Sequence, residues 1–152
     1  MSINPEKIKE MSYKSGDYIL REGAMCDSLI VVKSGQIEVF RKNARGEKVI
    51  LGLVQSGEYL GEMSLISDKP HSANAVALTD VKCLWISSEA IDHQLKDAPK
   101  WLLALTRGLV MKLARTNEIL RRNGIQDEHL YSSIKAIESK EDAKKINLKN
   151  VS

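Results

Sequence analysis

Cysteine is scarce in this sequence, and its placement argues against a disulfide-stabilised fold. Cys26 and Cys83 lie in apolar surroundings, with no paired spacing and no histidine nearby. Disulfide frameworks and zinc sites need several cysteines, or cysteines with histidines, at short regular spacings. We therefore interpret both residues as reduced thiols and expect a cytoplasmic protein.

Long hydrophobic runs are missing as well. The longest apolar stretches, such as 101–105, fall far short of the roughly 20 residues that a membrane-spanning helix needs. The N-terminus has no basic region followed by an apolar run, which argues against a secretory signal. The sequence accordingly predicts neither a membrane partner nor export.

Charge of one sign is only slightly in excess. The net charge of +3 is too small to indicate a nucleic-acid partner by itself. Basic residues do concentrate between 98 and 123, where six Lys or Arg accompany one Glu. The simplest interpretation of this local excess is a solvated helix face.

A catalytic or metal-binding constellation is also lacking. His71, His93 and His129 are dispersed, and neither a nucleophile–base set nor metal-ligand spacing accompanies them. We expect no catalytic residue, no metal site, no cofactor and no enzymatic activity.

The sequence does contain a series of short apolar segments separated by turn residues. Its 152 residues, 43% hydrophobic and 28% charged, suit one globular domain of ordinary size. Apolar runs that recur about every 8–12 residues, bounded by Gly, Asp or Ser, are typical of an antiparallel sandwich or barrel. The expected strands are 18–20, 29–32, 37–40, 49–51, 75–78 and 81–86.

Helical patterns flank this β-rich region. Pro5 and the spacing of Ile8 and Met11 favour a short helix over 5–11. After the last expected strand, Ser87 or Ser88 can cap a second short helix that ends at Leu95.

A long helix is predicted from Ala98 to about Arg122, capped by Asp97 and stopped by Asn123-Gly124. Its apolar residues occupy more than one stripe: Leu102, Leu105, Leu109, Val110, Leu113 and Leu120. One stripe can pack on the barrel while another meets the same helix of a second copy, which predicts a homodimer. The alternative is that both stripes are buried against the chain's own barrel.

The segment 125–152 is polar and carries balanced charge. Leu130, Ile134 and Ile137 have helical spacing, which predicts a short amphipathic helix before a flexible lysine-rich tail. The segment lacks the short helices separated by a glycine-containing turn that are typical of a helix-turn-helix, so direct DNA binding is not expected. We therefore predict a domain over 1–124, with its barrel at about 12–86 and its long helix at about 98–122.

The most informative stretch is 57–76, which reads GEYLGEMSLISDKPHSANAV. It describes a strand end, a turn made possible by Gly61, a short apolar helix, a turn closed by Pro70 and a new strand. A helix N-terminus opened by glycine presents backbone N–H groups, and the helix dipole there favours an anion. Glu62, beside that turn, can accept hydrogen bonds from a pair of hydroxyl groups such as a ribose presents.

This pattern resembles the phosphate-binding cassette of cyclic-nucleotide-binding domains, in which Gly-Glu, a short linker and Pro-Arg-Ser/Ala-Ala follow one another. The segments 14–17, 21–23 and 27–35 resemble the family's opening strands with their turn glycines, and the helix from Ala98 resembles its long C-terminal helix. The resemblance covers residues 10–122 and is to the sensor domain of catabolite-activator-like proteins without their helix-turn-helix domain. It implies a mainly β fold, an antiparallel β-barrel or jelly roll with flanking helices and a long C-terminal helix.

Carried over residue by residue, the resemblance implies a ligand site for cAMP or cGMP. Gly61 and the backbone of Met63 and Ser64 would face the cyclic phosphate. Glu62 would take the ribose 2′-hydroxyl, and Ser72 would add a hydroxyl near the phosphate or the base.

On the long helix, the segment 111–118 resembles the part of bacterial catabolite-activator relatives that reaches the purine. Thr116 and Asn117 are then the candidates for contact with the base. The alternative is that this Thr-Asn pair is ordinary polar surface.

One position departs from the family: the phosphate-binding Arg after the cassette proline is His71 here. A guanidinium is always charged and offers a planar fork, whereas histidine is mostly neutral at pH 7. Losing such a charge-assisted contact costs about 1.5–3 kcal/mol, or roughly one to two decades in affinity. Lys69 could compensate in part, as a mobile point charge.

Three interpretations of His71 follow. The protein binds a cyclic nucleotide weakly or with pH dependence, it is a ligand-free scaffold that acts through protein–protein contact, or it binds a different small molecule. The first is our leading hypothesis: a stand-alone regulatory module that signals through helix 98–122 to a dimer mate or another protein partner.

Overall fold

The computed structural model describes residues 7–25, 27–123 and 128–149, and within them the chain forms two sheets and four helices. The strands are β1 (Ile8–Tyr13), β2 (Tyr18–Leu20), β3 (Ser28–Ser34), β4 (Gln36–Lys42), β5 (Lys48–Gln55), β6 (Tyr59–Leu60), β7 (Asn74–Ala77) and β8 (Val81–Ser87). The helices are α1 (Glu62–Ser67), α2 (Ser88–Leu95), α3 (Lys100–Arg122) and α4 (Glu128–Lys149).

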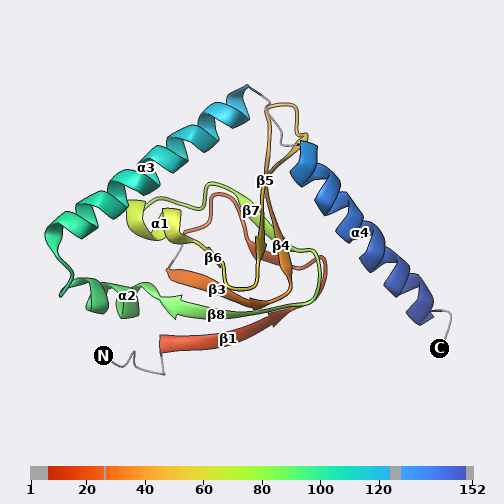
Figure 1. The fold of residues 1–152 in the computed structure, drawn as a ribbon, viewed down its shortest axis with the longest axis horizontal. Helices are drawn as coiled ribbons and strands as arrows, with labels where there is room; N and C mark the ends of the chain where they lie inside the picture. The colour runs from red at the N-terminus through yellow and green to blue at the C-terminus, as the bar shows by residue number, and fades with distance from the viewer. Residues whose placement is uncertain (1–6, 26, 124–127, 150–152) are drawn as a thin grey trace.

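The strands form two antiparallel four-stranded sheets, in the orders β1-β8-β3-β6 and β2-β7-β4-β5. They enclose one apolar core (Figure 1). Its most deeply buried members are Ile30, Val32, Ile37, Ala75, Ala77, Val81 and Cys83. The antiparallel barrel and all six expected strand segments are confirmed.

Alternation along β4 decides which side chains enter the barrel. Ile37 and Val39 belong to the core and pair with Ala77 and Ala75 of β7. Because successive strand residues point to opposite faces, Arg41 lies on the inner face as well. A charged side chain therefore follows two core residues at the end of β4.

The tight turn that connects β3 of one sheet to β4 of the other depends on Gly35. Its φ is 93°, a conformation that residues other than glycine rarely adopt. A Cβ at this position would also collide with the Asp80 carbonyl of the neighbouring turn. The crossing between the two sheets at this end of the barrel therefore favours glycine.

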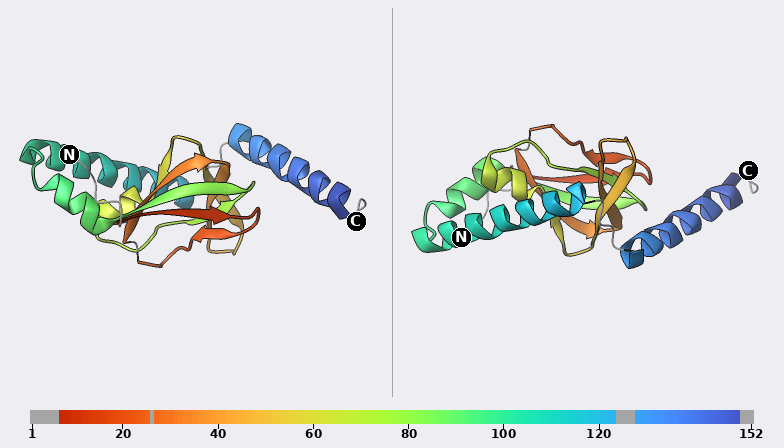
Figure 2. Two further views of the ribbon diagram at one scale, coloured as in Figure 1. Left: turned by 90° about the horizontal axis from the view of Figure 1, so that it is seen from below. Right: turned by 90° about the horizontal axis from the view of Figure 1, so that it is seen from above.

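Helices α1 and α3 lie together on one side of the barrel. The cassette helix α1 follows β6 directly, and α3 packs against it on the outside (Figures 1 and 2). Helix α2 connects the barrel to α3 and is capped by the Ser87 hydroxyl, which accepts a hydrogen bond from the Ala90 N–H at 3.3 Å. The predicted cap and end of α2 are confirmed, while α3 begins two residues later than expected.

Helix α4 lies on the opposite side of the barrel, where its first half covers the outer face of β5 (Figure 1). Ile134 is fully buried there against Ile50 and Leu78, and Leu130 and Ile137 pack beside it. The expectation of a short helix followed by a flexible tail was wrong for residues 138–149, which continue the helix. The apolar outer face of the sheet supplies the packing partner that a short polar sequence does not reveal.

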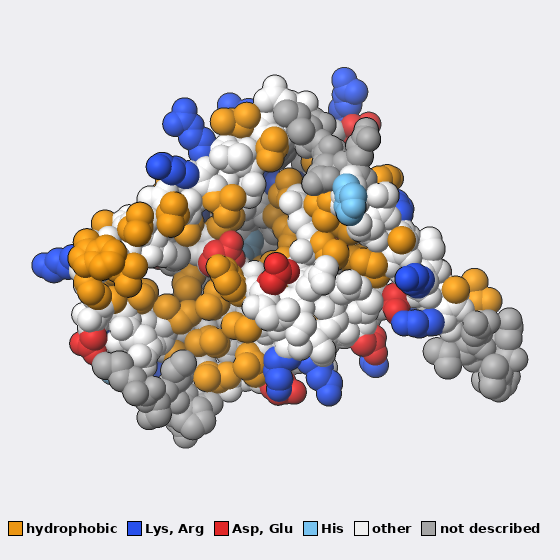
Figure 3. Space-filling view, in the orientation of Figure 1, with side chains coloured by type: hydrophobic (Ala, Val, Ile, Leu, Met, Phe, Trp, Pro, Cys, Tyr) orange, Lys and Arg blue, Asp and Glu red, His pale blue; other side chains and the backbone are white. Residues whose placement is uncertain are grey.

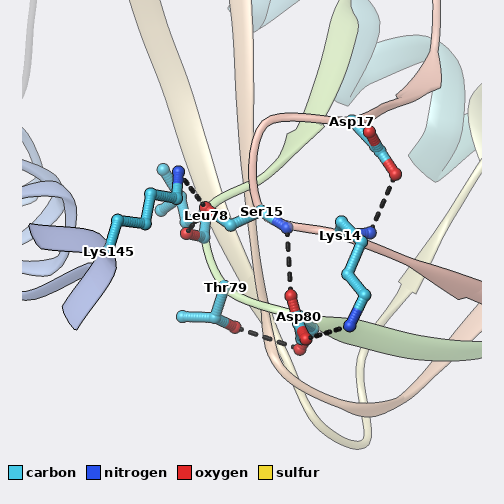
Figure 4. Close-up of polar contacts among 7 residues, drawn as sticks. All are labelled: Lys14, Ser15, Asp17, Leu78, Thr79, Asp80 and Lys145. Carbon is cyan, nitrogen blue, oxygen red and sulfur yellow. Dashed lines mark hydrogen bonds and ion pairs between the residues drawn. The ribbon is translucent and has the colours of Figure 1, made fainter. Parts of the chain in front are cut away.

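The C-terminal end of α4 reaches two turns of the barrel (Figure 4). Lys145 Nζ donates to the Ser15 hydroxyl at 3.4 Å, and that hydroxyl donates to the Leu78 carbonyl at 2.8 Å. Asp80 joins the same turns by accepting from Lys14 Nζ at 2.8 Å and from the Ser15 N–H at 3.2 Å. Both ends of α4 are therefore attached to the barrel.

The N-terminal expectation was wrong where the structure describes it. Residues 8–11 belong to strand β1 instead of a helix, so the barrel spans 8–87 and begins before residue 12. The β8 strand offers an open edge to which Ile8 through Tyr13 pair in continuous register. Tertiary pairing here overrides the helical spacing of two apolar residues. Residues 1–6 and Cys26 lie outside the described residues.

Candidate functional site

The cassette has the backbone geometry that its sequence predicts. Gly61 precedes α1 with φ 89° and ψ −6°, a left-handed turn that aims the helix start back toward the barrel. Gly61, as the N-cap residue, has no side chain to cap this N-terminus. The first N–H groups of a helix have no acceptor inside the helix, and the dipole at that end favours negative charge. The start of α1, which includes Met63, therefore suits an anionic group.

Glu62 is the first residue of α1 and the only acidic one in its first turn. It is half-buried, and burial raises the pKa of its carboxyl group above the ordinary 4.5, although a backbone hydrogen bond opposes the shift. The ionised form of this carboxyl group is therefore kept at a desolvation cost. Its oxygens are suited to accept hydrogen bonds from ligand hydroxyl groups.

His71 is held firmly by both its backbone and its side chain. Its N–H donates to the Ala24 carbonyl at 2.8 Å, and its own carbonyl accepts from the Gly23 N–H at 2.9 Å. The imidazole is 7% exposed, with Nδ1 at 3.0 Å from the Ser64 hydroxyl oxygen. Segment 70–74 is thereby fastened to the residues that follow β2, and the ring is fastened to α1.

The protonation state of His71 follows from this burial. Desolvation lowers the pKa of the imidazole below its ordinary 6.5, and the Asp27 carboxylate opposes that shift more weakly. The ring is therefore mostly neutral at pH 7. In the tautomer that accepts from the Ser64 hydroxyl at Nδ1, the ring keeps one N–H, at Nε2, to offer to a ligand.

The structure brings the cassette candidates together around α1. Gly61, Glu62 and Met63 are consecutive at its start, and Ser64 joins His71 through its side chain. Sequence reasoning assigned only the Ser64 backbone to the site and missed this side-chain pair, because no local spacing signals it. Ser72 is exposed.

The two candidates on α3 face different ways. Asn117 is half-buried, whereas Thr116 is exposed and its hydroxyl donates to the Lys112 carbonyl one turn back, at 3.0 Å. Of the two, Asn117 is therefore the less exposed to solvent.

Sequence reasoning also missed Arg41. Its guanidinium lies between two carboxylates: Glu22 just after β2, at 2.9 Å, and Glu118 on α3, at 3.1 Å. The available signal was the alternation of Ile37, Val39 and Arg41, which places a charged side chain on the inner face of a strand.

Among the residues that the structure describes, no group of three or more His, Cys, Asp or Glu side chains is arranged to hold a metal ion. No helix in the described ranges is long and apolar enough to cross a membrane. The one described cysteine, Cys83, is buried in the core, where desolvation raises the pKa of its thiol.

Comparison with known proteins agrees with this geometry. The family model described as "Cyclic nucleotide-binding domain" matches residues 10–98. A CRP-like cAMP-activated global transcriptional regulator of Mycobacterium tuberculosis is 24% identical over 115 residues, covering 76% of this chain and 51% of that protein. The human cGMP-dependent protein kinase 2 is 33% identical over 111 residues, covering 70% of this chain and 14% of the kinase.

Solved structures give the same result. The Thermus thermophilus catabolite activator protein superposes with a TM-score of 0.62 at 26% identity, over 80% of this chain and 59% of its own. A cAMP-bound EAL enzyme superposes with a TM-score of 0.67 at 26% identity, over 72% of this chain and 29% of its own. The chain spans about half or less of the length of the curated relatives it matches.

Proposed function

Since this chain belongs to the cyclic nucleotide-binding domain family, we propose that it is a regulatory module that binds cAMP or cGMP between α1, the segment 70–74 and α3. The observation that carries the proposal is the left-handed Gly61 turn that opens α1, with Glu62 beside it and the neutral, buried His71 next to the same helix. The M. tuberculosis relative is cAMP-activated and the human relative is cGMP-dependent, so both nucleotides are candidates.

In this proposal the cyclic phosphate lies at the start of α1, near the backbone of Gly61, Met63 and Ser64. The His71 Nε2–H donates to it, and Glu62 accepts from the ribose 2′-hydroxyl. A neutral imidazole supplies one donor where a guanidinium supplies a charged fork, so the affinity is low for a site of this type. Ser72 and the α3 residues Thr116 and Asn117 complete the candidate set, Asn117 toward the base.

Signalling would pass through α3, which packs on the cassette helix α1. A ligand that binds one packing of these helices better than another shifts the population toward it. Apolar side chains stay exposed along α3: Trp101, Leu102, Leu105, Leu109, Met111, Leu113 and Ile119. Hydrophobic side chains gather over the same helix in Figure 3.

Pairing of α3 with its copy in a homodimer would cover this surface, as a two-stranded helical interface does. The alternative that both apolar stripes are buried against the chain's own barrel does not fit these exposed side chains. A different protein partner on the same face is the other possibility, and it would connect the module to its target. We propose no DNA or membrane partner, no enzymatic activity and a cytoplasmic location.

A second function is favoured by one specific observation. The His71 ring is buried, neutral and already bonded to Ser64, which is the arrangement of a side chain used for structure. A scaffold that binds no nucleotide and acts only through protein–protein contact would keep this pair and the barrel.

Calorimetric titration separates the two functions. We expect the native chain to bind cAMP or cGMP with saturable heat at pH 6 and more weakly at pH 7.5. No binding of either nucleotide at millimolar concentration, together with binding by the His71→Arg variant, would support the scaffold and end the ligand proposal.

A further inference from the structure

Arg41 connects α3, which borders the proposed nucleotide site, to the ends of strands β2 and β4. It lies on the inner face of β4, following the core residues Ile37 and Val39, and its side chain is only 20% exposed. Nε and Nη2 lie 3.0 and 2.9 Å from the same oxygen of Glu22, and Nη1 lies 3.1 Å from a Glu118 oxygen. One guanidinium thus joins the end of β2, the end of β4 and helix α3.

The Glu22 side of this contact leads to the cassette. The Glu22 N–H donates to the side-chain oxygen of Asn74 at 3.1 Å, and the next two residues exchange backbone hydrogen bonds with His71. The segment that fixes Arg41 on this side is therefore the same segment that fixes the position of His71.

The contact between Arg41 and Glu118 lies next to the part of the proposed site that would hold the base. Glu118 directly follows Asn117, the half-buried candidate for base contact on α3. Glu118 also pairs with Arg122 at 3.0 Å, one turn further along the same helix, but that arginine is 73% exposed and does not reach the barrel. The Arg41 contact holds Glu118 to strand β4.

We infer that Arg41 is a positioning residue: through Glu118 and Glu22 it seats the second half of α3 over the nucleotide site, with Asn117 toward the base. This inference rests on the proposed function, because it names the residue that positions helix α3 over that site. A planar guanidinium suits the role, since its donors diverge toward two acceptors at fixed angles, whereas an ammonium group is a single mobile charge. The three side chains are 20%, 33% and 31% exposed, so solvent screens the contact less than it screens a surface pair.

The test compares Arg41→Met with the matched control Arg122→Met. Each variant removes one cationic partner of Glu118 and keeps an unbranched apolar stem, but Arg41→Met removes the contact between α3 and strand β4, whereas Arg122→Met removes a contact within α3. Hydrogen exchange of the 112–122 amides is measured without ligand, and nucleotide affinity by calorimetry. For Arg41→Met we expect exchange at least about fivefold faster and affinity about fivefold to tenfold weaker, the range of a modest coupling between sites. For Arg122→Met we expect changes within about twofold, as for a surface i,i+4 pair.

Glu118→Gln keeps the Arg41–Glu22 contact, and it is the variant to measure if Arg41→Met does not fold. It should reproduce the faster exchange of α3, and adding Arg41→Met to it should have little further effect on nucleotide affinity. Equal exchange in native protein, Arg41→Met and Glu118→Gln would overturn the positioning role. If the native chain binds no cyclic nucleotide, the proposed function fails by itself, while the exchange data still decide whether Arg41 seats α3.

Discussion

Replacing His71 by arginine tests the proposed ligand site at the position where the chain departs from its family. In the tautomer in which Nδ1 accepts from the Ser64 hydroxyl at 3.0 Å, the native ring offers one neutral N–H, at Nε2. Arginine would offer two charged, parallel donors. The difference between a neutral and a charge-assisted contact is about 1.5–3 kcal/mol, so we expect His71→Arg to bind cAMP or cGMP one to two decades more tightly.

The same change should weaken the protein when no ligand is present. His71 is 7% exposed, so an arginine there places a charge in a buried site, which the Asp27 carboxylate offsets only in part, and Ser64 loses its partner. We expect a fall in unfolding free energy of about 1–3 kcal/mol, measured by urea denaturation, and its recovery on saturation with nucleotide. An affinity gain coupled to a stability loss is the signature of a residue aimed at the ligand.

The pH dependence gives a second signature. Burial keeps the pKa of free His71 below 6.5, and a bound phosphate would raise it, so binding takes up a proton. Native affinity should therefore rise as pH falls from 8 toward 6, while the arginine variant stays flat over that range. Calorimetry in buffers of different ionisation enthalpy measures the proton uptake directly. Equal affinity of the two proteins at pH 7.5, with the same pH profile, would refute the assignment of His71 to the phosphate.

The remaining predictions concern stability and assembly. Because folding lowers the pKa of His71, the unfolded chain binds a proton at this residue more readily than the folded chain does. Without ligand, the unfolding free energy should therefore be highest above pH 6.5 and decline below it. His71→Gln should reduce this pH dependence in urea titrations. Leu109 is 58% exposed on α3, and light scattering should show that Leu109→Glu converts a native dimer to a monomer. A native chain that is monomeric at high micromolar concentration would contradict the pairing of two α3 helices. Ile134 lies on α4 and is fully buried against Ile50 and Leu78. Ile134→Ala should lower the unfolding free energy by about 2–5 kcal/mol and speed amide exchange in α4, an effect absent if the helix is attached by its ends alone. Gly35→Ala, at φ 93° and against the Asp80 carbonyl, should lower the melting temperature more than Gly46→Ala, whose added Cβ meets open space.

Local signals in the sequence were sufficient for the barrel and the cassette. The regular return of apolar runs between turn glycines predicts strands, because positive φ at Gly16, Gly23 and Gly35 is a backbone requirement that the residue type itself reports. The Gly61-Glu62 pair predicts the helix start for the same reason. The substitution of His for Arg after Pro70 is equally visible, and with it the question of phosphate affinity.

Contacts between distant segments were not visible in the sequence. Strand β1 forms because the edge of β8 is open to Ile8–Tyr13, which no local pattern reveals. Helix α4 packs its first half on the outer face of the second sheet, where Leu130, Ile134 and Ile137 meet Ile50 and Leu78. The Ser64–His71 pair and the Arg41–Glu118 contact join residues that are 7 and 77 positions apart.

The sequence by itself therefore determined the fold class and the place of the candidate site, since backbone conformation and side-chain periodicity are local properties. Only the tertiary structure decided that His71 is buried and bonded to Ser64, that Arg41 lies between two carboxylates, and that one face of α3 stays uncovered. Burial and charge pairing depend on which segments the fold brings together, and that is decided by the packing of the whole chain.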